Sequence, residues 1–167
     1  MFKKGERVVY PNHGIGVIEE IQDLKVDGEN WNCYCLRIEA SDTKVMVPTD
    51  KAEMVGLRRI INKKEVEQLF TVLKNGSVKM QSNWKGRFKE NSDKMRTGSI
   101  FEVADVLKNL NYLSSIKNLS YREKRMLEKA RQLIVSEIAV VRRTSEEKID
   151  AQIEKVLGTA VKVQSSH

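Results

Sequence analysis

One helix-start pattern recurs through the chain after residue 62 and constrains the fold more than any other feature. In each copy an Asn, Ser or Thr is followed three residues later by Glu, so that the two side chains can cap a helix N-terminus reciprocally. The copies are Asn62 with Glu65, Ser99 with Glu102, Ser120 with Glu123, and Thr144 with Glu147. Apolar residues at helical spacing follow each copy, which predicts a helical C-terminal part.

Five helices are expected in that part, and glycines indicate where some of them stop. Gly76 and Gly98 stand where C-terminal stops belong, and the tail from Gly158 is expected to fray. The expected helices cover residues 63–74, 84–96, 100–113, 121–142 and 146–157.

The first 60 residues instead read as short strands with tight turns. Strand-like runs cover 7–10, 16–21, 32–38 and 44–47, and Asp27-Gly28 is a strong hairpin-turn signal. This succession of short strands and tight turns favours a small SH3-like or Tudor-like β-barrel. The expected fold class is therefore α+β and multidomain, with a barrel at 1–55 and an all-α bundle of about five helices at 63–160.

Charge is distributed unequally between these parts. Residues 1–62 carry 9 Lys and Arg against 10 Asp and Glu, whereas residues 63–167 carry 21 against 13. The whole positive excess of the chain, +7, therefore comes from the helical part. Such an asymmetry indicates an anionic partner for that part.

Several function classes are disfavoured by what the sequence contains. Cys33 and Cys35 are too few for a disulfide framework or a zinc site, and His13 has no partner motif that would make it catalytic. We expect no catalytic residue, no metal and no cofactor, and hence no enzyme. The N-terminus lacks the apolar stretch of a secretory signal, and no run suggests a membrane span, which predicts a cytoplasmic protein.

Trp84 is the most informative residue of the helical part. It falls in the first turn of an expected helix, within a basic stretch (79–96) whose cations outnumber Glu90 and Asp93. An aromatic ring framed by cations suits partly opened nucleic acid, where it can act as a wedge. A Trp that closes a small helical core is the equally open alternative. The basic residues of the stretch are Lys79, Lys85, Arg87, Lys89, Lys94 and Arg96.

A second basic segment lies on the expected helix 121–142. Arg122, Arg125 and Lys129 share one side of this helix, and Lys124 and Arg131 form a second stripe. Two basic segments in one half favour contact with phosphates over a merely solvated face. The residues expected to contact DNA are Trp84, Lys85, Arg87, Lys89, Arg122, Lys124, Arg125 and Lys129.

Taken together, these segments resemble the CarD-like family (the CarD/CdnL type) of bacterial transcription regulators, over nearly the whole chain. The resemblance rests on Phe2–Gly14, on Val47-Pro48 followed by Val55-Gly56, on Asn83–Asn91 and on Leu119–Leu127. The order of these motifs is specific, although a module similar to the barrel alone occurs in transcription-repair coupling helicases.

The resemblance implies a division of labour that matches the charge split. It implies that the barrel pairs a strand edge with the RNA polymerase β subunit. The helical half would hold promoter DNA at the upstream edge of the transcription bubble, with Trp84 in the minor groove. The protein is then a monomeric regulator that stabilises the open promoter complex.

The docking edge expected on polymerase is the strand of Lys44, Val45, Met46 and Val47, because an unpaired edge can accept a partner strand. Met46 and Gly86 depart from the residues expected at their positions. Two other functions stay open: a polymerase-bound adaptor that recruits a protein without touching DNA, and a sequence-specific repressor. The repressor is disfavoured because neither basic segment shows an amide-plus-arginine reading face.

Overall fold

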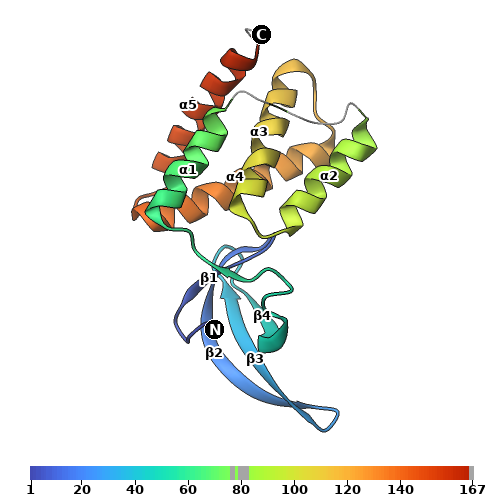
Figure 1. Cartoon of the computed structure of the whole chain (residues 1–167), viewed down its shortest axis with the longest axis vertical. Helices are drawn as coiled ribbons and strands as arrows, with labels where there is room; N and C mark the ends of the chain where they lie inside the picture. Colours follow the sequence, from blue (N-terminus) through green and yellow to red (C-terminus); the bar gives the residue numbers. More distant parts are fainter. Residues whose placement is uncertain (76–77, 79–82, 166–167) are drawn as a thin grey trace. The chain divides into compact units, whose positions relative to one another are not determined.

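The computed structural model describes residues 1–75, 78 and 83–165, and divides into two compact units (Figure 1). The first unit spans Met1–Ile60 and the second Ile61–His167. Gly76, which is expected to end a helix, and Lys79, one of the basic residues of the stretch around Trp84, lie outside the described residues.

The N-terminal unit is a five-stranded antiparallel sheet in the order β4-β3-β2-β1-β5. A 3-10 turn, η1 (Thr49–Lys51), follows β4. The strands are β1 (Arg7–Tyr10), β2 (Gly14–Val26), β3 (Glu29–Ile38), β4 (Thr43–Pro48) and β5 (Arg58–Arg59).

The expected barrel is not confirmed, because this sheet is open. β4 and β5 are its two ends, and no pairing joins them among the described strands. β5 has only two residues, which gives it little backbone with which to close a barrel. The finding is therefore an α+β chain with an antiparallel sheet and a separate helical unit.

Local signals decide much of the strand geometry. Asp27 and Gly28 both have positive φ (52° and 81°), as a two-residue hairpin turn requires, and they join β2 to β3. A register shift between Ile18 and Glu20 marks a bulge in β2, which explains why apolar and polar residues do not alternate regularly there. One face of the sheet buries Ile18, Tyr34 and Leu36 with other apolar side chains.

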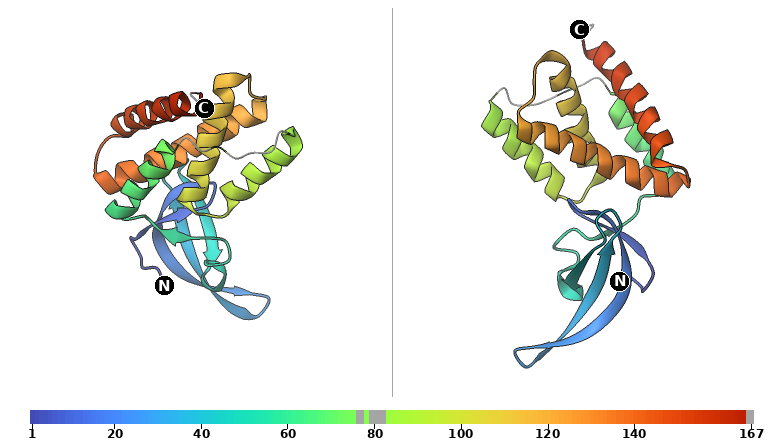
Figure 2. Two further views of the ribbon diagram at one scale, coloured as in Figure 1. Left: turned by 45° about the horizontal axis from the view of Figure 1, so that its top comes forward. Right: turned by 180° about the vertical axis from the view of Figure 1, so that it is seen from behind.

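The described residues of the helical unit form five helices around an apolar core. α1 lies beside α5, and α4 contacts α1, α3 and α5 (Figure 2). Leu107, Leu110, Ile134, Ile138 and Ile153 are fully buried in this core. The helices are α1 (Lys63–Lys74), α2 (Trp84–Arg96), α3 (Ile100–Ile116), α4 (Tyr121–Arg142) and α5 (Glu146–Ser165).

Two of the predicted caps are confirmed. Asn62 forms a full capping box with Glu65, and Ser120 Oγ accepts a hydrogen bond from the Glu123 amide at 3.2 Å. Gly98 has a φ of 83°, which suits the stop after α2.

Ser99 is the N-cap residue of α3 as predicted but forms no cap bond, whereas the Thr144 cap and the end of the last helix are predicted wrongly. Ser99 precedes α3 without a side-chain cap bond, and Ser145 rather than Thr144 accepts from the first turn of α5, at Lys148. α5 also continues through Gly158 to Ser165. Leu157 and Ala160 are buried on either side of Gly158, so tertiary packing continues the helix past Gly158 despite the low helix propensity of glycine.

No helix of the described residues combines the length and the apolarity that a membrane span needs.

Candidate nucleic-acid interface

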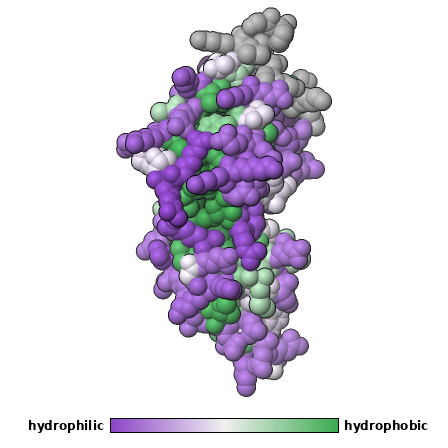
Figure 3. All heavy atoms as spheres, turned by 60° about the vertical axis from the view of Figure 1, so that its left-hand side comes forward, coloured by the Kyte–Doolittle hydropathy of each residue, from purple (hydrophilic) through white to green (hydrophobic). Residues whose placement is uncertain are grey.

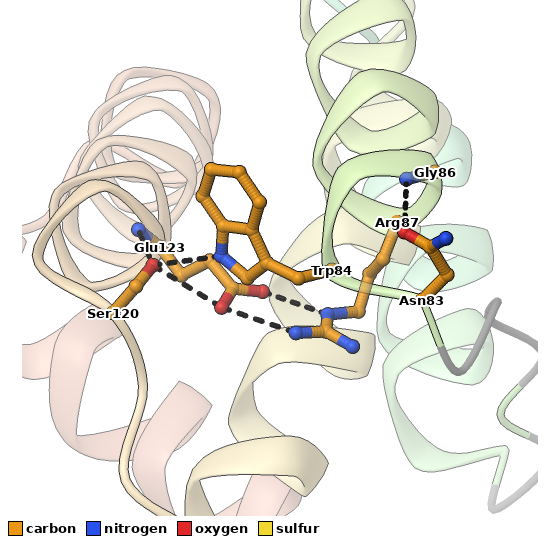
Figure 4. Close-up of polar contacts among 6 residues, drawn as sticks. All are labelled: Asn83, Trp84, Gly86, Arg87, Ser120 and Glu123. Atoms are coloured by element: carbon orange, nitrogen blue, oxygen red, sulfur yellow. Dashed lines mark hydrogen bonds and ion pairs between the residues drawn. The ribbon is translucent and has the colours of Figure 1, made fainter.

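Trp84 begins α2 and is held in a defined orientation while part of its ring stays in solvent. Asn83 caps the helix by accepting from the Gly86 amide at 3.2 Å, which makes Trp84 the first helical residue. The indole Nε1 donates to Ser120 Oγ at 3.1 Å (Figure 4). The ring also stacks on Phe88, with 5.4 Å between the two centroids. Because 37% of the residue is exposed, Trp84 is neither a core residue nor a free surface side chain.

A four-residue network of Trp84, Ser120, Glu123 and Arg87 ties the first turn of α2 to the first turn of α4. The Ser120 hydroxyl that accepts from the indole donates to Glu123 Oε1 at 3.2 Å. Arg87 Nε donates to Glu123 Oε2 at 2.8 Å, and Arg87 Nη2 to Oε1 at 3.3 Å. Trp84 and Arg87 both belong to α2, and Ser120 and Glu123 at the start of α4 link them through hydrogen bonds. The contacts therefore form a closed network that orients the indole (Figure 4).

The ion pair in this network is buried. Arg87 is 3% exposed and Glu123 is 1% exposed. Burial raises the pKa of the Glu123 carboxyl, but the hydrogen bond and charge of Arg87, together with the Ser120 bonds, bring the net pKa below its usual range. Glu123 is therefore ionised at neutral pH, near the positive end of the α4 dipole.

Arg87 is consequently misplaced in the predicted set of DNA contacts. Its guanidinium is enclosed and paired with Glu123, so it cannot reach a phosphate on the surface. The structure gives it a positioning role instead. A partner 36 residues away cannot be read from local sequence.

The other predicted contact residues of this interface lie on the surface. Lys85 and Lys89 are exposed on α2, and Arg122, Lys124, Arg125 and Lys129 are exposed on α4. Among the described residues, no acidic side chain forms an ion pair with any of these six. Unpaired cations of this kind keep their full charge for an anionic partner.

Neighbouring cations are already engaged within the protein. Lys94 pairs with Asp105 and Arg96 with Asp93. Arg131, which the sequence places in the second basic stripe, contacts Asp150 and Glu154 on α5 at 2.6 Å each. It therefore joins helices rather than facing a ligand.

Aromatic rings and arginines meet on this surface. The Arg122 guanidinium lies 5.7 Å from the Phe88 ring, and that of Arg125 lies 5.8 Å from the Tyr121 ring. Tyr121 is 73% exposed and directly follows Ser120, the acceptor of the Trp84 indole. An exposed ring with a cation beside it can contact a base and a phosphate together.

The strand predicted to dock on polymerase, β4, is an end strand of the sheet. It pairs with β3 on one side, from Thr43 opposite Ile38 to Pro48 opposite Cys33. Lys44 is exposed, Val45 is half-buried and Met46 is 46% exposed, whereas Val47 is 2% exposed and points into the core. Val47 can therefore offer a partner only its backbone.

Two family models together match almost the whole chain. The model described as "CarD, C-terminal domain" matches residues 68–154, and "CarD-like/TRCF RID domain" matches residues 2–61. The chain is 33% identical over 149 residues to "Putative transcription factor YdeB" of Bacillus subtilis (strain 168), covering 89% of this chain and 97% of that relative. The chain belongs to the CarD-like family.

Membership of the CarD-like family confirms the resemblance found in the motifs and places the protein among transcription factors. Three residues of the candidate interface are nevertheless not predicted as such from the sequence. The sequence indicates Ser120 and Glu123 as a capping pair and Tyr121 only as part of the family motif Leu119–Leu127. The exposed aromatic at the start of a basic helix was a usable signal for Tyr121. The bond from Ser120 to Trp84 depends on the packing of two helices.

Proposed function

We propose that this CarD-like protein is a non-enzymatic transcription regulator that stabilises the open promoter complex. In this proposal the helical unit contacts DNA at the upstream edge of the bubble largely without reading sequence, and Trp84 enters the minor groove as a wedge. The β4 edge of the N-terminal unit binds the RNA polymerase β subunit.

The observation that carries the proposal is that Trp84 is partly exposed and yet held in a fixed orientation. Its ring is partly exposed, yet one edge is fixed by Ser120 and one face by Phe88. A ring that is already immobilised loses little conformational freedom when it inserts between bases. The unpaired cations on α2 and α4 can then neutralise the phosphates on either side.

The deciding experiment measures the lifetime of open complexes with Trp84→Ala. Unstacking a base step costs on the order of a few kcal/mol, which an inserted ring partly offsets. A loss of about 1.4 kcal/mol of this offset shifts the opening equilibrium about tenfold. We expect open complexes to decay about tenfold faster while polymerase binding is unchanged.

Thermal unfolding of the same variant tests the alternative that Trp84 belongs to the core. Because the ring is partly exposed, its removal should cost less than the roughly 3–5 kcal/mol of a fully buried Trp. Tyr112→Ala, at a half-buried aromatic of α3, is a matched control that should lower stability without shortening the lifetime. Equal lifetimes for Trp84→Ala and Tyr112→Ala would refute the wedge.

DNA affinity in salt separates this proposal from an adaptor that never touches DNA. The logarithm of affinity should fall linearly with the logarithm of salt concentration, with a slope of about −0.9 for each phosphate contacted. Lys124→Ala or Arg125→Ala should make the slope shallower by about one unit on unrelated duplexes alike. No measurable DNA binding even at low salt would support the adaptor, whereas binding that is independent of salt would contradict phosphate neutralisation.

A further inference from the structure

A groove between α1 and α5 forms a second feature of the helical unit and shares no lining residue with the Trp84 network. It has a volume of about 520 Å³. Glu67, Phe70 and Lys74 line it from α1, and Gln152, Lys155 and Thr159 from α5. Both sets have i, i+3, i+7 spacing, so each wall is about two helical turns, or roughly 10 Å, long.

The floor of the groove is apolar. Phe70 and the half-buried Val156 lie at its base, next to the core of the unit. Figure 3 views the helical unit from the side of α1 and α5 and shows hydrophobic surface between rows of hydrophilic side chains. Apolar surface set between two parallel rows of polar side chains is the shape that accepts one face of another helix.

Arg142 is held over the Phe70 ring, near Glu67 and Gln152, and so covers part of the floor. Its guanidinium lies 4.7 Å from the centroid of the Phe70 ring, donates to Gln152 Oε1 at 2.9 Å and pairs with Glu67 at 3.6 Å. This side chain is therefore oriented before any partner arrives.

The rim carries more positive than negative charge. Three cations, Lys74, Arg142 and Lys155, face one acid, Glu67, and that acid is already used by Arg142. Within the described part of the chain, neither Lys74 nor Lys155 has an acidic partner. The groove thus combines an apolar floor with free positive charge on both walls.

We propose that this groove binds an acidic amphipathic helix of a partner protein, with large apolar side chains on the floor and carboxylates against Lys74 and Lys155. The length of two turns fits apolar residues at i and i+4 of the incoming helix. The charge of the rim selects acidic flanks over basic ones. The chain would then hold a protein partner on a face separate from its Trp84 surface.

The test titrates the full-length, ¹⁵N-labelled protein with a helix-stabilised peptide of roughly 14 residues that carries Phe and Leu at i and i+4 and Glu on both flanks. We expect saturation below about 1 mM. Amide shift changes should be confined to residues around Phe70, Arg142, Gln152 and Val156. A peptide of the same composition with Phe and Leu on opposite faces, and one with Lys in place of Glu, should bind at least tenfold more weakly.

Charge reversal in the protein gives the matched control. Lys74→Glu combined with Lys155→Glu should lower the affinity for the acidic peptide by about tenfold, because two attractive charge interactions become repulsive. Both lysines are exposed, so thermal unfolding should be unchanged. Lys64→Glu with Lys117→Glu makes the same change in net charge outside the groove and should leave affinity within about twofold.

Three outcomes would overturn the proposal: no saturable binding, equal binding of the three peptides, or shift changes centred on Arg122 and Arg125. The last would show that the acidic peptide simply seeks the basic surface near Trp84. None of them bears on the DNA-binding proposal, since the assay contains no DNA.

Discussion

Removal of the negative charge from Glu123 should destabilise the helical unit more than any surface change. Glu123→Gln keeps the size of the side chain but leaves the Arg87 guanidinium enclosed without its counter-ion. Breaking a buried pair in this way typically costs about 3–5 kcal/mol, because one charge stays buried and uncompensated.

The structure supports the full effect rather than a screened one. Both partners are almost completely enclosed, and two hydrogen bonds of 2.8 and 3.3 Å join them. For a unit of this size the loss corresponds to a fall in melting temperature on the order of 10–30 °C. Glu128→Gln, at an exposed position of the same helix, is the control and should stay within about 0.5 kcal/mol of the parent protein.

The effect should depend on pH in a defined direction. The pKa of Glu123 is lower in the folded protein than its ordinary value of 4.5, so its ionisation favours the folded state at neutral pH. That contribution is present above about pH 4.5 and is lost as the pH falls through the folded-state pKa. The stability difference between the parent protein and Glu123→Gln should therefore be constant near pH 7 and shrink below pH 4.5.

Chemical denaturation at pH 7 and pH 4, followed by far-ultraviolet circular dichroism, measures these differences. The double variant Arg87→Met with Glu123→Leu should recover much of the loss, because it removes both charges together. A cost below about 1 kcal/mol for Glu123→Gln at pH 7, where the pair is fully ionised, would refute the reasoning.

Three further outcomes are expected. Ser120→Ala should lower the stability of the helical unit by about 1 kcal/mol, because the N-cap of α4 is lost. It should also shorten the lifetime of open complexes, because the Trp84 indole loses its hydrogen-bond acceptor. A normal lifetime would show that the Ser120 bond does not position the ring. Gly158→Ala should stabilise the helical unit by about 0.5–1 kcal/mol in thermal unfolding, because Gly158 lies inside α5 and an added Cβ meets no atom within 4 Å; a destabilised variant would contradict the uninterrupted helix. Met46→Asp should weaken capture of RNA polymerase by the full chain without changing its stability. The control, Ile21→Asp, lies at a similarly exposed position of β2 and should bind polymerase normally. Equal binding by both variants would show that β4 is not the docking edge.

Local chemistry was readable from the sequence wherever neighbouring residues settle the geometry. Asn62 with Glu65 and Ser120 with Glu123 mark helix starts because a cap bond spans only three residues. Asp27-Gly28 marks the β2–β3 turn because its backbone needs positive φ. The order of such motifs along the chain was also sufficient to indicate the family, which the family models then confirmed.

Tertiary packing decided the features that depend on residues far apart in the chain. In the sequence, Arg87 cannot be distinguished from the neighbouring cations that are expected to contact phosphates. Only the packing of α4 against α2 places Glu123 beside Arg87 and buries the guanidinium. Gly158 predicts a helix end, yet the burial of Leu157 and Ala160 carries α5 onward. The open sheet likewise follows from how few residues β5 contributes to pairing. For Arg87 and Gly158 the free energy of burying or pairing distant groups exceeds a local preference of about 1 kcal/mol, so the neighbouring sequence by itself could not reveal the outcome.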